Sequence, residues 1–131
     1  MLCHIFWYIF IQNYYISFIA VDKTGWIGII GAGPQAVWQL RFLASIVATG
    51  NVLLRTRSRE TAEKFVAKMR DSTCELDRRW NIVIADSSSD FKRCQLIHTL
   101  TNSRKPVLSM ADLDASNGGL HITAVGADSP G

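Results

Sequence analysis

Three groups of residues in this chain could do chemistry together: a glycine turn, an arginine cluster and one late carboxylate. The glycine turn is Gly31-x-Gly33-x-x-Ala36, which follows the apolar run Trp26–Ile30 and precedes an amphipathic stretch. Gly31 permits a tight turn, Gly33 lets a pyrophosphate approach the backbone, and Ala36 lets a helix pack close to the strand. The turn therefore predicts dinucleotide binding at a helix N-terminus. A strand–helix corner that needs glycine for its geometry alone is the alternative.

The arginine cluster indicates which dinucleotide would bind. NAD-binding folds usually place Asp or Glu about 20 residues after the glycines, where it holds the ribose 2′-hydroxyl. This chain instead has Arg55-Thr56-Arg57-Ser58-Arg59. Guanidinium and hydroxyl groups bind a 2′-phosphate through charge-assisted hydrogen bonds. We therefore expect NADP(H) to be preferred, with NAD(H) possible; a solvated helix start is the alternative reading of the arginines.

The carboxylate is Asp128, in the loop that follows the last expected strand, Leu120–Val125. The carboxyl ends of parallel strands lie at one edge of the sheet, and open α/β sheets bind ligands there. Asp128 would then face the cofactor and act as a catalytic residue. A surface turn residue is the alternative.

Apolar and amphipathic runs alternate from Trp26 onward, which predicts βαβ units. The expected fold class is α/β, a Rossmann-type doubly wound, mostly parallel sheet with flanking helices. The expected strands are 26–30, 52–55, 82–85, 96–100 and 120–125, with a further short strand beginning at 107–108. The expected helices are 34–47, 59–70 and 91–94, with a polar connection over 74–80.

Composition limits the possible partners and location. With 131 residues, 48% hydrophobic and 19% charged, the chain is a single globular domain at most. Its net charge of +3 is small and scattered, which argues against a nucleic-acid surface but suits a phosphorylated ligand. The three cysteines and three histidines show no metal-ligand spacing. We therefore expect no metal site, free thiols and a reducing, cytoplasmic location.

The composition changes at Asp22, which predicts two parts: an apolar leader over 1–21 and an NAD(P)-binding Rossmann domain over 22–131. The leader has nearly the length of a membrane span. Polar residues interrupt it, however, and no basic residue precedes it. A buried strand pair or a mis-joined start of the reading frame is therefore favoured over a membrane anchor.

The chain from about residue 25 to residue 131 resembles the ornithine cyclodeaminase/mu-crystallin family. The segments that carry the resemblance are GIIGAGPQAVWQL, RTRSRETAEKFVAKM, TLTNSRKPVL and VGADSPG. The resemblance implies a Rossmann domain joined to a second domain that binds substrate and forms homodimers. Members include ornithine cyclodeaminases, ketimine reductases, amino-acid dehydrogenases, and mu-crystallins that bind NADPH and thyroid hormone.

The resemblance also implies roles for individual residues. The pyrophosphate would contact Gly31, Gly33, Pro34, Gln35 and Ala36. The adenosine ribose or its phosphate would contact Thr56, Arg57 and Ser58. Thr99, Leu100 and Thr101 would lie beside the cofactor, and Val125 and Gly126 near the nicotinamide. Asp128 matches the acid that serves as general base or substrate-amine ligand while hydride moves between the nicotinamide and an amino acid or cyclic imine.

The chain departs from the family at both ends. Family members have a long N-terminal portion that contacts the substrate carboxylate, and they continue past the position of Gly131. We therefore expect a partial family chain whose own enzymatic activity and oligomeric state are open. The alternative function is a non-catalytic module that binds NADPH and a small ligand.

Overall fold

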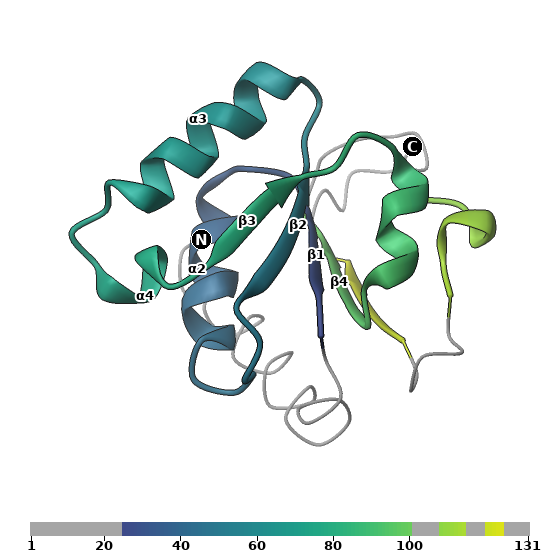
Figure 1. Cartoon of the computed structure of the whole chain (residues 1–131), viewed down its shortest axis with the longest axis horizontal. Coiled ribbons are helices and arrows are strands. Elements are labelled where there is room, and N and C mark those ends of the chain that lie inside the picture. The colour runs from purple at the N-terminus through teal and green to yellow at the C-terminus, as the bar shows by residue number, and fades with distance from the viewer. Residues whose placement is uncertain (1–24, 101–107, 115–119, 125–131) are drawn as a thin grey trace.

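A computed structural model describes residues 25–100, 108–114 and 120–124 of the chain (Figure 1). Its strands are β1 (Ile27–Ile30), β2 (Asn51–Arg55), β3 (Asn81–Ile84), β4 (Leu96–Thr99) and β5 (His121–Ala124). Its helices are α2 (Pro34–Leu43), α3 (Arg59–Arg70) and α4 (Glu75–Arg78), with the 3₁₀ helices η1 (Ser88–Arg93) and η2 (Met110–Asp112).

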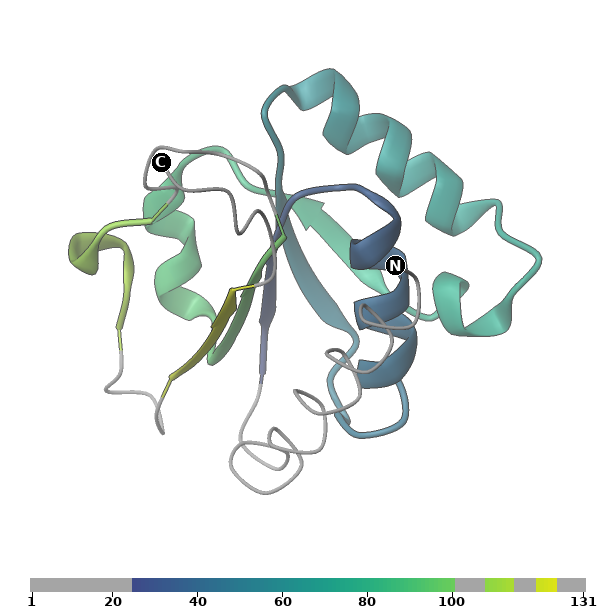
Figure 2. The same cartoon turned by 180° about the vertical axis from the view of Figure 1, so that it is seen from behind.

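The strands form one parallel sheet in the order β3-β2-β1-β4-β5. Helices α2, α3 and α4 lie on one side of the sheet, and η1 and η2 lie on the other (Figures 1 and 2). The chain reverses its direction of winding between β1 and β4, which are neighbours in the sheet. This is the Rossmann arrangement, so the predicted fold class is confirmed; the described strands are all parallel.

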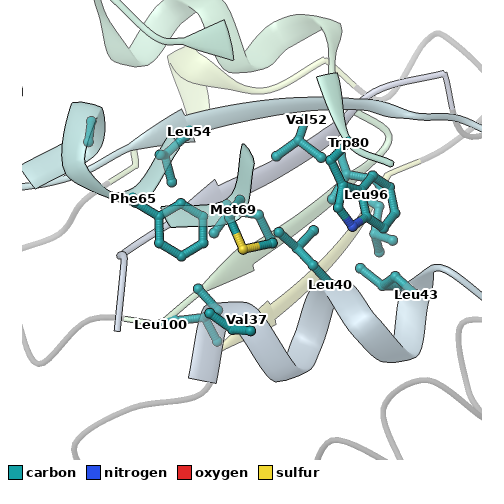
Figure 3. Packing of buried hydrophobic residues seen from close by; sticks show 14 of the residues in the cluster. Val37, Leu40, Leu43, Val52, Leu54, Phe65, Met69, Trp80, Leu96 and Leu100 are labelled. Atoms are coloured by element: carbon teal, nitrogen blue, oxygen red, sulfur yellow. The ribbon is translucent and has the colours of Figure 1, made fainter. Parts of the chain in front are cut away.

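The larger core lies between the sheet and helices α2 and α3 (Figure 3). Side chains alternate between the two faces of a strand, and Ile27 and Ile29 of β1 face this core. Helix α2 contributes Val37, Leu40 and Leu43 at helical spacing, all buried. Apolar residues at this spacing explain why the segment folds as a helix against the sheet.

The opposite face of β1 packs closely against η1. A Cβ added to Gly28 would lie 2.7 and 2.8 Å from two atoms of the Phe91 ring and 3.2 Å from the Cys94 sulfur. Glycine at this position therefore lets Phe91, which is fully buried, lie directly on the sheet. Burial also raises the pKa of the Cys94 thiol to about 12.

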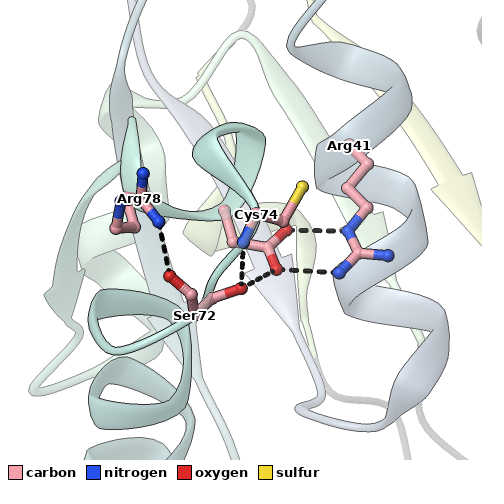
Figure 4. Close-up of polar contacts among 5 residues, drawn as sticks. Arg41, Ser72, Cys74 and Arg78 are labelled. Atoms are coloured by element: carbon pink, nitrogen blue, oxygen red, sulfur yellow. Dashed lines mark hydrogen bonds and ion pairs between the residues drawn. The ribbon is translucent and has the colours of Figure 1, made fainter.

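An ion pair joins α2 to α4 (Figure 4). The Arg41 Nε and Nη2 groups donate to the two carboxylate oxygens of Asp77 at 2.8 and 2.9 Å. The Ser72 hydroxyl donates to the same carboxylate at 2.7 Å. Hydrogen bonding to Arg41 lowers the pKa of Asp77 below its ordinary value, although burial opposes this. The charge of this buried carboxylate is therefore balanced within the fold.

Several expected boundaries were wrong. Helix α2 ends at Leu43 rather than at 47, with Ala44 as its C-cap. The connection over 74–80 contains the short helix α4, and the expected helix over 91–94 is part of the longer η1. Leu108 is not in a strand, because the chain there leads into η2. Within the described part of the chain, no helix is long and apolar enough to cross a membrane. The expected leader over 1–21 lies outside the described residues.

Candidate dinucleotide-binding site

The glycine turn is fixed between the ends of β2 and β4. The Gly31 N–H donates to the Arg55 carbonyl at 2.9 Å, and the Leu100 N–H donates to the Ile30 carbonyl at 2.7 Å. Gly31 has φ of +119°, and a Cβ there would lie 2.7 Å from the Leu100 carbonyl oxygen. Both the conformation and the crowding require glycine. Gly31 thus forms the tight turn that its spacing predicts.

Gly33 has the opposite surroundings. It is the N-cap of α2, it is exposed, and no side chain caps the helix from this position. A Cβ added to Gly33 would find nothing within 4 Å. Pro34 opens the helix and has no N–H to satisfy. The first turn of α2 therefore meets open space, and unpaired helical N–H groups attract anions.

The rest of the turn packs inward. The Ala36 N–H donates to the Gly33 carbonyl at 3.0 Å, and the Ala36 side chain is fully buried in the core with α2 and β1. A larger side chain would push the helix away from the sheet. Gln35 is half-buried beside it. Gly31, Gly33, Pro34, Gln35 and Ala36 are thus brought together at one sheet edge.

A second feature lies at the ends of β2 and β3. A pocket of about 270 Å³ is lined by residues 55–59, Ala62 and residues 84–86. Ser58 caps α3, because its hydroxyl accepts from the Thr61 N–H at 3.2 Å. The Thr56 hydroxyl donates to the Ser58 carbonyl. Arg57 is exposed and has no ion pair to any residue that the structure describes. Its guanidinium group can therefore bind an anionic ligand.

The third group lies at the ends of β4 and β5. Thr99 pairs with Ile30 of β1 on one side and with Ala124 of β5 on the other. Thr99 is half-buried and Leu100 is buried. The predicted residues Thr101, Val125, Gly126 and Asp128 lie outside the described residues. The described part of β5 ends at the same sheet edge as the glycine turn.

Sequence reasoning missed the acidic residue of the pocket lined by Arg55, Arg57 and Arg59. Asp86 lines it two residues after β3 ends, and the Ala85 N–H donates to the Leu54 carbonyl at 2.8 Å. The rule that ligands lie beyond the carboxyl ends of parallel strands applies to β3 as much as to β2. Applied to β3, this rule would have made Asp86 a candidate site residue. Among the residues that the structure covers, no three His, Cys, Asp or Glu side chains come together as a metal site.

Comparisons with known proteins agree with this geometry. The family model for the ornithine cyclodeaminase/mu-crystallin family matches residues 15–131. Alanine dehydrogenase of Archaeoglobus fulgidus is 34% identical over 115 residues, which are 88% of this chain and 33% of the dehydrogenase. The chain thus spans about a third of that relative's length.

Two solved structures have the same fold. An archaeal alanine dehydrogenase dimer with bound NAD superposes with a TM-score of 0.68 at 27% identity, over 84% of this chain and 31% of the other. The pyrroline-2-carboxylate reductase of Thermococcus litoralis, in complex with NADH and L-proline, gives a TM-score of 0.74 at 24% identity, over 88% and 33%. The match to the family model covers most of the sequence, and this chain therefore belongs to the ornithine cyclodeaminase/mu-crystallin family.

Proposed function

We propose that this chain binds a nicotinamide adenine dinucleotide at the carboxyl edge of its sheet, with residues 22–131 as the cofactor domain. In full-length members of the family, such a domain serves an oxidoreductase or cyclodeaminase that acts on amino acids or cyclic imines. The observation that carries the proposal is the open backbone at Gly33, where an added Cβ would meet nothing within 4 Å. Relatives solved with NAD and NADH support the same cofactor class.

The pyrophosphate contacts the glycine turn in this proposal. Gly33 and Gln35 present backbone N–H groups at the start of α2, and Gly31 and Pro34 shape the turn before it. Ala36 keeps the helix close to the sheet, which holds these N–H groups at the strand ends. The absence of a side-chain cap at Gly33 supports this assignment, because a diphosphate then takes the place of a capping oxygen.

The adenosine end lies in the arginine-lined pocket, and its phosphate decides the cofactor. Arg57 binds a 2′-phosphate through charge-assisted hydrogen bonds, with the hydroxyl groups of Thr56 and Ser58 beside it. No carboxylate stands at the end of β2 to hold a 2′-hydroxyl, since residues 55–59 contain no acid. This supports a preference for NADP(H), with NAD(H) as a weaker ligand.

The nicotinamide end lies by β4 and β5, near Thr99, Leu100, Thr101, Val125 and Gly126. A nicotinamide held there would supply hydride transfer to or from the α-carbon of the substrate. Asp128 accepts the proton of the substrate amine as a general base, or binds that amine as a carboxylate. The pairing of Thr99 with Ala124 supports this, because the chain leaves β5 beside the end of β4.

A cytoplasmic location belongs to the same proposal. Cys74 and Cys94 are free thiols, which supports a reducing compartment. The alternative of a non-catalytic NADPH-binding module is not favoured, because the relatives named above are a dehydrogenase and a reductase.

Fluorescence titration of the full chain with NADPH and NADH tests the cofactor assignment. Arg57→Ala should weaken NADPH binding about tenfold, because it removes a charge-assisted contact, and should leave NADH binding within about twofold. Lys64→Ala is the matched control, because Lys64 is an exposed cation on α3 whose ion pair is with Glu60, outside the pocket. Absence of binding to either dinucleotide would overturn the proposal. Tighter binding of NADH would overturn the NADP(H) preference alone.

Turnover assays test the catalytic part. Alanine, ornithine and cyclic ketimines are the substrates to offer, with NADP⁺ or NADPH as appropriate. Asp128→Asn should abolish turnover while NADPH binding stays unchanged. Equal turnover by this variant would remove Asp128 from the mechanism.

A further inference from the structure

The residues that line the arginine-lined pocket include three arginines and one acid, Asp86. Arg55, Arg57 and Arg59 line it from the segment between β2 and α3, and Asp86 lines it from the turn after β3. That turn is fixed, because the Asp86 N–H donates to the Asp90 carboxylate at 3.0 Å. The backbone at Asp86 is therefore held in place at the edge of the sheet where the arginines lie.

Arg59 is shared between two carboxylates. Its Nη1 lies 3.3 Å from Asp86 Oδ1, and its Nε lies 3.5 Å from Glu63 Oε1. Asp86 lines the pocket, whereas Glu63 lies one helical turn along α3 and does not. The Arg59 side chain is 63% exposed and that of Asp86 88% exposed. Solvent-exposed ion pairs are weak, so a stronger anion can take Arg59 from Asp86.

We propose that Asp86 sets the choice between a 2′-phosphate and a 2′-hydroxyl in this pocket by competing with the phosphate for Arg59. The inference rests on the proposed dinucleotide site. A phosphomonoester carries a charge of about −1.5 to −2 at neutral pH. Asp86 repels such a group and occupies Arg59, a cation that the phosphate would otherwise bind. A ribose 2′-hydroxyl is not repelled, and it can donate a hydrogen bond to a carboxylate.

The consequence is that the pocket prefers NADP(H) over NAD(H) less strongly than it would without Asp86. The arginines attract NADP(H), and Asp86 reduces their advantage so that NAD(H) still binds. Removal of the Asp86 charge should therefore raise selectivity for NADPH, whereas removal of the Glu63 charge should not.

The test compares Asp86→Asn with Glu63→Gln in the full chain, by titration with NADPH and NADH. Each substitution removes one negative charge and one ion pair of Arg59, but only the first changes the pocket. Asp86→Asn should tighten NADPH binding about three- to fivefold, the upper part of the range for an exposed ion pair, and should leave NADH binding equal or weaker. Glu63→Gln should leave the NADPH-to-NADH affinity ratio within about twofold. Asp86→Ser should repeat the result without an amide that can itself bind phosphate.

The salt dependence gives an independent readout. The gain from Asp86→Asn should shrink as salt is added, because exposed charges are screened. Equal gains from both substitutions would show an effect of net charge and overturn the inference. Loss of both cofactors in Asp86→Asn would make Asp86 a ligand contact and would also overturn it. If the unmodified chain binds NADPH but the ratio does not change in Asp86→Asn, the inference alone fails; if it binds neither dinucleotide, the proposed function fails as well.

Discussion

A methyl group added at Gly31 should lower the stability of the fold, whereas the same group added at Gly33 should lower the affinity for the dinucleotide. At Gly31, alanine would have to adopt φ of +119°, with its Cβ 2.7 Å from the Leu100 carbonyl oxygen and 3.0 Å from the carbonyl carbon. Both neighbours are backbone atoms of the residue after β4, so no side-chain rotation relieves the contact. Unfavourable backbone conformations cost about 1–3 kcal/mol, and the clash adds to this. We expect Gly31→Ala to lose about 3 kcal/mol of unfolding free energy or more.

At Gly33, alanine meets neither problem. The residue has φ of −82° and ψ of −174°, which any amino acid adopts, and its Cβ would have nothing within 4 Å. Alanine reduces the entropy of the unfolded chain but is a poorer N-cap than glycine, so the unfolding free energy should change by less than about 1 kcal/mol. The methyl would occupy the space in front of α2, so affinity for the dinucleotide should fall about tenfold or more.

Two measurements on each variant decide the outcome. Urea unfolding followed by circular dichroism gives the unfolding free energy, and titration with NADPH gives the affinity. A Gly33→Ala chain that folds and binds NADPH like the unmodified chain would refute the assignment of this open space to the diphosphate. A Gly31→Ala chain of unchanged stability would refute the account of the turn.

The packing makes three other outcomes testable. Asp77→Asn should lower the unfolding free energy by about 2 kcal/mol at neutral pH, measured by urea unfolding. Arg41 lowers the pKa of Asp77 in the folded chain. The difference in unfolding free energy should therefore be present above the ordinary carboxyl pKa and vanish as the pH falls through the lowered pKa of the folded chain. Gly28→Ala should lose about 1–3 kcal/mol by overpacking, and Phe91→Leu in the same chain should recover part of it, because the added Cβ meets the Phe91 ring at 2.7 Å. Because burial raises the pKa of Cys94 to about 12, alkylation of its thiol at mildly alkaline pH, mapped by peptide mass spectrometry, should require unfolding; rapid labelling of the native chain would contradict this.

The sequence alone was sufficient to place the five strands that the structure describes along the chain and to predict helix α3. That helix spans Arg59–Arg70, as its amphipathic spacing predicts. Local signals of this kind need no knowledge of distant residues. The end of α2 was missed because Val47 continues the apolar spacing and is buried, although it lies beyond the helix and the turn that follows it.

What could not be predicted depends on contacts between distant segments. The Arg41–Asp77 ion pair joins residues 36 positions apart, and the pair of Arg59 with Asp86 joins residues 27 positions apart. No local pattern marks either one. The spacing predicted that Gly31 forms the turn and that Gly33 leaves room for a ligand. Only the structure shows that a Cβ at Gly31 would clash with the backbone, whereas a Cβ at Gly33 would meet nothing within 4 Å.

The central position of β1 affects the order in which the strands of this domain can pair as the domain folds. Ile27 pairs with Val52 on one side and with Leu96 on the other. During synthesis, β1 and β2 can pair early, whereas the second flank of β1 must wait for about 70 further residues. A strand edge left unpaired for that long can recruit other chains. The nascent domain is therefore most vulnerable to aggregation before β4 has emerged and paired with the free edge of β1.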